Sequence, residues 1–135
     1  IAVGQDGFPA FWSRTSGLAA PLRLDDPGAI ARCHDLRARM GLRGGQLVAN
    51  PIPEPDEIPK AEIDIAIEAA LADAEALGIQ GKAVTPFLLN RIFELTEGRS
   101  LKANIALVLN NARLAAAIAK ELSMIDAENR PDGSG

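Results

Sequence analysis

The fold of this chain is decided by residues 21–49, PLRLDDPGAIARCHDLRARMGLRGGQLVA, in which strand-like and helix-like patterns alternate. Residues 21–24 alternate weakly between apolar and polar side chains, as in a short strand. The Asp-Pro pair at 26–27 is a common helix start, because aspartate accepts a free backbone N–H and proline has a helical φ. Apolar residues then recur at helical spacing up to a glycine, and the apolar run 46–49 predicts another strand.

The rest of the chain continues this alternation. Residues 1–3 are an apolar run before a glycine, which predicts a buried strand, and the proline-rich residues 50–55 exclude a helix or a central strand. Three more helices are predicted, from Pro59 to Leu77, from Phe87 to Leu95 and from Leu101 to Met124. Thr85 and Ser100 are the expected N-caps of the last two. The expected inner stripe of the first comprises Ile63, Ile67, Ala70, Leu71, Ala74 and Leu77.

Strands that alternate with helices indicate an α/β fold, with crossover helices and a parallel or mixed sheet. The predicted strands are too few to complete such a sheet. A chain that starts on a core strand is also unusual, because exposed termini normally fray before the first buried element. We therefore expect the sheet to be shared with sequence outside this chain. Residues 1–125 are expected to belong to one domain, and the polar residues 126–135 to be a disordered tail.

The composition excludes several classes of protein. The chain has 135 residues, of which 47% are hydrophobic and 24% charged, so one packed core is expected. Its net charge is −4 and its basic residues are scattered, which argues against a nucleic acid partner. No apolar run approaches the roughly 20 residues that span a bilayer. The single cysteine, Cys33, allows no internal disulfide and fits a soluble protein of the reducing cytoplasm.

The last predicted helix carries asparagines where aliphatic residues would be more stable. At 100° per residue, Asn104 and Asn111 lie about 20° apart and share a stripe with Leu107 and Val108, whereas Asn110 points elsewhere. Two carboxamides on a mostly apolar stripe need hydrogen-bond partners. Those partners are either backbone groups of a neighbouring loop or the donor and acceptor edge of a small ligand.

Other candidate groups are weaker. His34 follows Cys33 directly, so their side chains diverge by about 100° on a helix and cannot act as a nucleophile and base pair. The glycine-rich residues 41–45 precede a strand, whereas a phosphate loop follows a strand and opens a helix. Arg14 lies in a polar turn, where it is either solvated or faces a phosphate. These residues do not amount to a self-sufficient active site.

Several motifs together carry a family resemblance. They are Phe8–Arg14 (FPAFWSR), Pro21–Asp25 (PLRLD), Val48–Pro53 (VANPIP), Thr85–Leu89 (TPFLL), Ala103–Val108 (ANIALV) and Asn110–Ala112 (NNA). In this order and spacing they resemble the C-terminal part of the pseudouridine-5'-phosphate glycosidases, a family that includes the indigoidine synthase A-like proteins. The resemblance runs from Ile1 to about Leu122.

The resemblance implies a lyase, a pseudouridylate synthase, which reversibly splits the C–C glycosidic bond of pseudouridine 5'-phosphate into uracil and ribose 5-phosphate. It implies a three-layer α/β/α sandwich with a mixed sheet, incomplete in this chain, a homotrimer, and a divalent metal, typically manganese. The catalytic lysine that forms a Schiff base, the glutamate that moves protons and the metal ligands lie upstream of the matched block. We therefore expect this chain to hold no catalytic or metal-binding residue and to be inactive without the N-terminal half.

The family's late helix contributes an asparagine to the active site. The resemblance favours Asn104 as this substrate-binding residue, with Asn111 second. The alternative function is a non-catalytic interaction or assembly module that keeps the scaffold of the fold.

Overall fold

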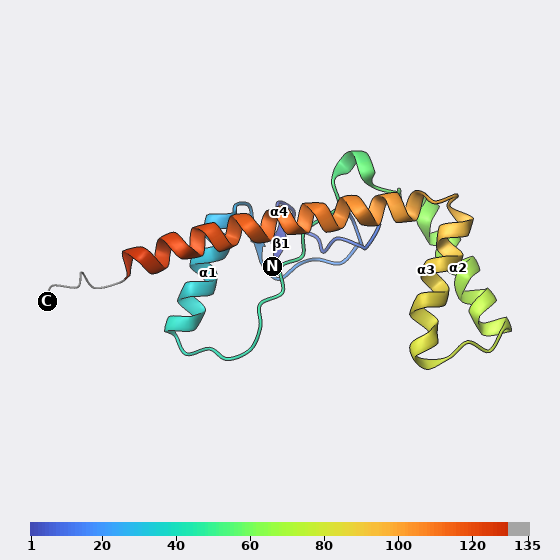
Figure 1. The fold of residues 1–135 in the computed structure, drawn as a ribbon, viewed down its shortest axis with the longest axis horizontal. Coiled ribbons are helices and arrows are strands. Elements are labelled where there is room, and N and C mark those ends of the chain that lie inside the picture. The colour runs from blue at the N-terminus through green and yellow to red at the C-terminus, as the bar shows by residue number, and fades with distance from the viewer. Residues whose placement is uncertain (130–135) are drawn as a thin grey trace, which may run out of the picture.

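A computed structural model describes residues 1–129 of the chain. Its elements are β1 (Ala2–Val3), β2 (Arg23–Leu24), α1 (Pro27–Arg39), η1 (Glu54–Asp56), α2 (Lys60–Ala76), η2 (Gly81–Ala83), α3 (Val84–Leu95) and α4 (Arg99–Glu128). The long helix α4 runs along the whole molecule. The strands and α1 lie under the middle and the second half of α4. The α2–α3 hairpin projects away from the N-terminal end of α4 (Figure 1).

The sheet is small and parallel. β1 pairs with β2 on one side, and a single parallel bridge joins Ala2 to Ala49 on the other. The α/β class and the incomplete sheet are thus confirmed. The predicted strand 46–49 is wrong as a full strand, because only Ala49 pairs. The two-residue β1 offers no longer ladder, and before Ala49 its edge makes one contact, from the Ile1 amino group to the Leu47 carbonyl at 2.9 Å.

Helix α1 begins as the sequence predicted. The Asp26 carboxylate accepts the N–H of Ala29 at 2.7 Å, and Pro27 occupies the first turn. The buried residues Ile30 and Ala31 lie on this helix, which packs against the second half of α4. The segment that connects β2 to Ala49 contains α1, and through this helix it packs against α4.

The core lies between α2, α3, α4 and the loop before α2. Its buried members are Trp12, Ile52, Ile58, Ile63, Ala66, Ala70, Ile92, Ala103 and Leu107. In α2 the buried stripe consists of Ile63, Ala66, Ala70 and Ala74. The predicted inner positions Leu71 and Leu77 are wrong, since both are exposed. Helix α2 packs against α3, and three of the four buried residues of α2 are alanines. The buried face of α2 is therefore narrow.

Two predicted helix starts are also wrong. Helix α3 begins at Val84 without a side-chain cap, so Thr85 lies inside its first turn. Helix α4 begins at Arg99 after Gly98, which has a left-handed φ of 82°, and Ser100 is buried inside the first turn. In each case a tight turn from the preceding element leads into the helix, and this turn replaces a local cap.

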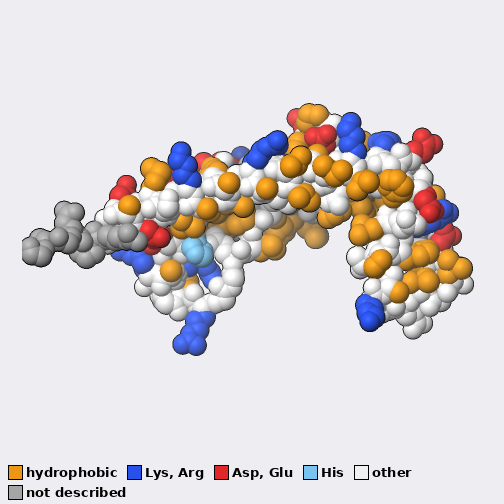
Figure 2. Space-filling view, in the orientation of Figure 1, with side chains coloured by type: hydrophobic (Ala, Val, Ile, Leu, Met, Phe, Trp, Pro, Cys, Tyr) orange, Lys and Arg blue, Asp and Glu red, His pale blue; other side chains and the backbone are white. Residues whose placement is uncertain are grey.

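Helix α4 also ends later than predicted. It continues to Glu128, into the segment 126–135 that was expected to be a disordered tail. Residues 130–135 lie outside the described residues. Figure 2 shows apolar side chains along α4 and on the α2–α3 hairpin. Within residues 1–129, no helix is both long enough and apolar enough to cross a membrane.

Candidate functional site

Asn104 lies in a pocket of about 330 Å³ between α3, the first turns of α4 and the turn that carries Trp12. Ligand pockets commonly measure about 300–1,000 Å³, so this one suits a small group such as a single ring. Its lining residues are Trp12, Leu89, Phe93, Ser100, Leu101 and Asn104. The pocket is therefore mainly apolar, with one carboxamide.

The carboxamide of Asn104 is the group that can recognise a ligand in this pocket. It is half-buried and makes no side-chain hydrogen bond with any other residue of 1–129. An asparagine side chain offers an acceptor oxygen and a donor nitrogen side by side. Such a group matches a planar molecule whose edge carries a donor beside an acceptor.

Asn111 lies elsewhere on the same helix. It is exposed, and its Oδ1 accepts the Nδ2 of Asn50 at 3.1 Å. The neighbouring Asn110 donates its Nδ2 to the carbonyl of Pro51, also at 3.1 Å. These two amides tie α4 to the loop before η1, which is the structural role that the sequence analysis left open for Asn111 and did not consider for Asn110. The structure brings Asn104 and Asn111 onto one helix but not into one pocket.

Two further candidates make structural contacts. Arg14 donates through Nη1 to the carbonyl of Ile52 at 2.8 Å, so its guanidinium braces the proline-rich loop. Cys33 is half-buried and lies 3.4 Å from the Nε2 of Gln46, while His34 is exposed. The side chains of Cys33 and His34 do not pair, in agreement with the predicted helical geometry.

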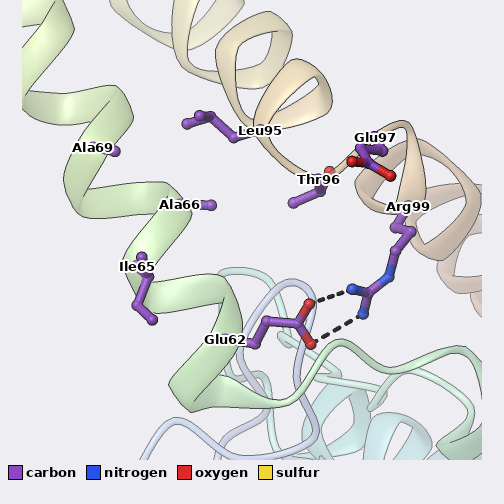
Figure 3. A pocket seen from close by; sticks show the side chains of 8 residues that line it. All are labelled: Glu62, Ile65, Ala66, Ala69, Leu95, Thr96, Glu97 and Arg99. Atoms are coloured by element: carbon purple, nitrogen blue, oxygen red, sulfur yellow. Dashed lines mark hydrogen bonds and ion pairs between the residues drawn. The ribbon is translucent and has the colours of Figure 1, made fainter.

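A second hollow of about 420 Å³ lies between α2 and the α3–α4 turn (Figure 3). Arg99 forms a bidentate ion pair with Glu62 there, and the Nη2–Oε2 distance is 3.1 Å. The hydrogen bonds from Arg99 hold the pKa of Glu62 below its ordinary value. No sequence pattern indicated this pair, because its members are 37 positions apart. It holds two elements together and includes no nucleophile.

The part of the chain that the structure describes supplies no metal site of its own. Among residues 1–129, no group of three or more His, Cys, Asp and Glu side chains is placed to bind a metal ion. These residues would therefore not hold the divalent metal by themselves, and the resemblance assigns its ligands to upstream sequence.

Comparison with known proteins places the chain in a family. The family model described as "Indigoidine synthase A like protein" matches residues 1–121. The chain belongs to this family. Its curated relatives include the pseudouridine-5'-phosphate glycosidase of Paracoccus denitrificans, which is 68% identical over 91% of this chain and 40% of the relative. The corresponding protein of Roseobacter denitrificans is 66% identical over 90% of this chain and 39% of the relative.

Two solved structures of related proteins share the fold. The prealnumycin C-glycosynthase in complex with ribulose 5-phosphate has a TM-score of 0.85 and 31% identity, and the match covers 95% of this chain and 42% of that one. An indigoidine synthase A-like protein from Thermotoga maritima has a TM-score of 0.75 and 41% identity, with coverage of 87% and 39%. The chain of this family member thus spans about 40% of the length of its curated relatives and matches their C-terminal part.

Proposed function

We propose that this chain is the C-terminal segment of a lyase that reversibly cleaves pseudouridine 5'-phosphate into uracil and ribose 5-phosphate. The observation that carries the proposal is the 68% identity, over 91% of the chain, to a protein named pseudouridine-5'-phosphate glycosidase. The pocket around Asn104 supports it, because a carboxamide among apolar side chains suits a pyrimidine ring.

In this proposal Asn104 binds the uracil group. Uracil carries N–H donors beside carbonyl acceptors, so one edge pairs with the oxygen and nitrogen of a carboxamide. Leu89 and Phe93 provide apolar walls against which the faces of the ring can pack. Asn111 is the second candidate, although its oxygen is already bound by Asn50.

The reactive groups belong to sequence that precedes the matched region in the relatives. Opening the sugar needs a primary amine that forms an iminium, which can accept electrons as the C–C bond breaks. The lysine that provides it, the glutamate that moves protons and the divalent metal, manganese, are assigned to that N-terminal part. A homotrimer and a cytoplasmic location complete the proposal. The 135-residue chain is therefore expected to be inactive alone.

A chimera tests the function directly. The residues that precede the matched region in the Paracoccus denitrificans relative would be joined to Ile1 of this chain, and release of uracil from pseudouridine 5'-phosphate would be followed. We expect the chimera to turn over substrate, and the separate 135-residue chain and the separate N-terminal part to be inactive. A folded but inactive chimera, or an active isolated chain, would contradict the proposal.

Substitutions in the active chimera then test the site. Asn104→Ala removes one or two hydrogen bonds to uracil, so we expect a loss of about ten-fold or more in kcat/KM with little change in melting temperature. Asn111→Ala is the matched control on the same helix, with an expected effect below about three-fold. A larger effect of Asn111→Ala than of Asn104→Ala would reverse the assignment.

The alternative is an assembly module without catalysis. The apolar side chains that α4 leaves exposed favour it, among them Leu101 at 50% and Ile105 at 53%. The chimera distinguishes the two functions, because an assembly module would give a folded chimera without restoring turnover.

A further inference from the structure

The backbone of Ser100 is held at both ends by groups from outside α4. Its carbonyl accepts the indole Nε1–H of Trp12 at 3.1 Å, and its N–H donates to the Oγ1 of Thr96 at 3.1 Å. Ser100 and Thr96 are both buried, and Trp12 is only 8% exposed. The start of α4 is therefore fixed by two buried hydrogen bonds.

These bonds compensate for a weak local start of the helix. Gly98 at the N-cap has a φ of 82° and provides no side-chain cap. Glycine adopts many backbone conformations, so it does not by itself fix the direction in which a helix leaves a turn. Gly98 and Arg99 donate to the carbonyls of Phe93 and Thr96 within the turn, and beyond these backbone bonds the direction of α4 depends on the groups that bind Ser100.

The carbonyl that Trp12 binds is directly linked to Asn104. In an α-helix the carbonyl of residue i accepts the N–H of residue i+4, so the Ser100 carbonyl also accepts the backbone N–H of Asn104. A carbonyl oxygen has two lone pairs and can accept both donors. Trp12 and Asn104 also line the same pocket.

Trp12 is itself anchored on the opposite side. Its carbonyl accepts the N–H of Ile58 at 2.8 Å, and the next residue, Ser13, donates its hydroxyl to the carbonyl of Ile58 at 2.6 Å. Ser13 is fully buried and Ile58 is 2% exposed. The indole is therefore a rigid link between the loop before α2 and the first turn of α4.

We propose that Trp12 is a positioning residue for Asn104, which acts by binding the Ser100 carbonyl and so sets where the carboxamide points into the pocket. The inference rests on the proposed role of Asn104 in binding uracil. Tryptophan suits this task because it fills an apolar wall and also donates one N–H, whereas phenylalanine would fill the wall but remove the second donor to the Ser100 carbonyl.

The test uses the chimera and measures the KM for uracil in the synthetic direction, with ribose 5-phosphate in excess. Trp12→Phe should raise this KM about five-fold, while kcat changes less. Phe11→Leu is the matched control. The ring of Phe11 packs edge-on against the Trp12 indole, with 4.7 Å between the ring centroids, and it has no N–H to donate to α4. The substitution should leave the uracil KM unchanged within two-fold or so.

A double-mutant cycle separates positioning from general stability. If Trp12 acts through Asn104, then Trp12→Phe has no further effect on the uracil KM once Asn104→Ala is present. Effects that multiply, or an unchanged KM in Trp12→Phe alone, would overturn the positioning role and leave the proposed function intact. An unchanged KM in Asn104→Ala would overturn the proposed uracil contact, and the positioning role with it. The melting temperature should fall equally in both backgrounds, since the lost hydrogen bond from the indole to the Ser100 carbonyl does not involve the Asn104 side chain.

Discussion

Thr96 joins the end of α3 to the start of α4 through one hydroxyl group. Its Oγ1 donates to the carbonyl of Ile92 at 2.7 Å and accepts the N–H of Ser100 at 3.1 Å. Thr96→Val keeps the shape of the side chain but leaves a buried N–H and a carbonyl with fewer partners. We expect a loss of about 1–3 kcal/mol in the free energy of unfolding, measured by urea denaturation at low protein concentration.

The control for this substitution is Ser123→Ala on the exposed face of α4. Its hydroxyl donates to the carbonyl of Lys120 at 2.8 Å, but water can replace that bond. The expected change is within about 0.5 kcal/mol. Equal effects of the two substitutions would show that burial of Thr96 does not matter.

The three asparagines of α4 show what residue spacing can predict. The helical wheel placed Asn104 and Asn111 on one stripe, and the unbroken helix Arg99–Glu128 preserves that geometry. The wheel could not tell which of them faces a neighbour. That depends on Trp12 and Phe93 at Asn104, and on Asn50 at Asn111. Each of these partners is remote in the chain or belongs to another element.

Helices α2 and α4 are joined by the ion pair of Glu62 and Arg99. The pKa of Glu62 is lower in the folded chain than its ordinary value because Arg99 donates hydrogen bonds to the carboxylate. A lowered folded pKa means that the pair stabilises the fold above the ordinary carboxyl pKa, and that this contribution is lost as the pH falls through the lowered value. The pair is solvent-exposed, so a modest contribution is expected.

Urea denaturation between neutral and acidic pH tests this prediction. The difference in stability between the wild type and Glu62→Gln should be constant at neutral pH and shrink on acidification below the ordinary carboxyl pKa. In an Arg99→Gln background, the pH-dependent part of the difference should become smaller, because the cause of the shift is gone. A difference that stays constant down to the acid limit would contradict the assignment.

At the level of the elements, helix bodies were predicted well and helix ends less so. Asp26 was correctly identified as the cap of α1 because its carboxylate bonds three residues ahead. Ser100 was not a cap, because Thr96 already binds its N–H from the preceding turn. Likewise, η2 leads directly into α3, so Thr85 was not needed there. Caps are predictable where the chain enters a helix from an extended residue, and not where two helices meet in a tight turn.

At the scale of the whole molecule, helix α4 exposes several large apolar side chains to solvent. Leu101, Ile105, Val108 and Leu109 are each at least 50% exposed. Their spacing places them on the side of the helix opposite to the buried Ala103 and Leu107. Single exposed leucines are common, but a contiguous apolar stripe normally packs against another surface.

We therefore predict that the isolated chain self-associates. Light scattering coupled to size-exclusion chromatography should give a mass above 14.2 kDa that rises with concentration. Ile105→Lys should lower this mass, because a charge in the stripe opposes burial. Lys102→Gln, on the same helix outside the stripe, should leave the mass unchanged. A monomer at every concentration tested would contradict the prediction.

Local pattern was sufficient for the α/β class, the positions of the four long helices, the cap of α1 and the family resemblance. The resemblance rests on the order of motifs along the chain, and the other features depend on residues within a few positions of one another, whose spacing and backbone preferences are visible in the sequence. The pocket was not visible in this way. Trp12 and Ser100 are 88 positions apart, and Glu62 and Arg99 are 37 apart, so only the packing of α3, α4 and the loop before α2 brings such groups together. The sequence indicated that Asn104 needs a partner, and the tertiary fold placed it in an apolar pocket beside the indole that fixes its helix.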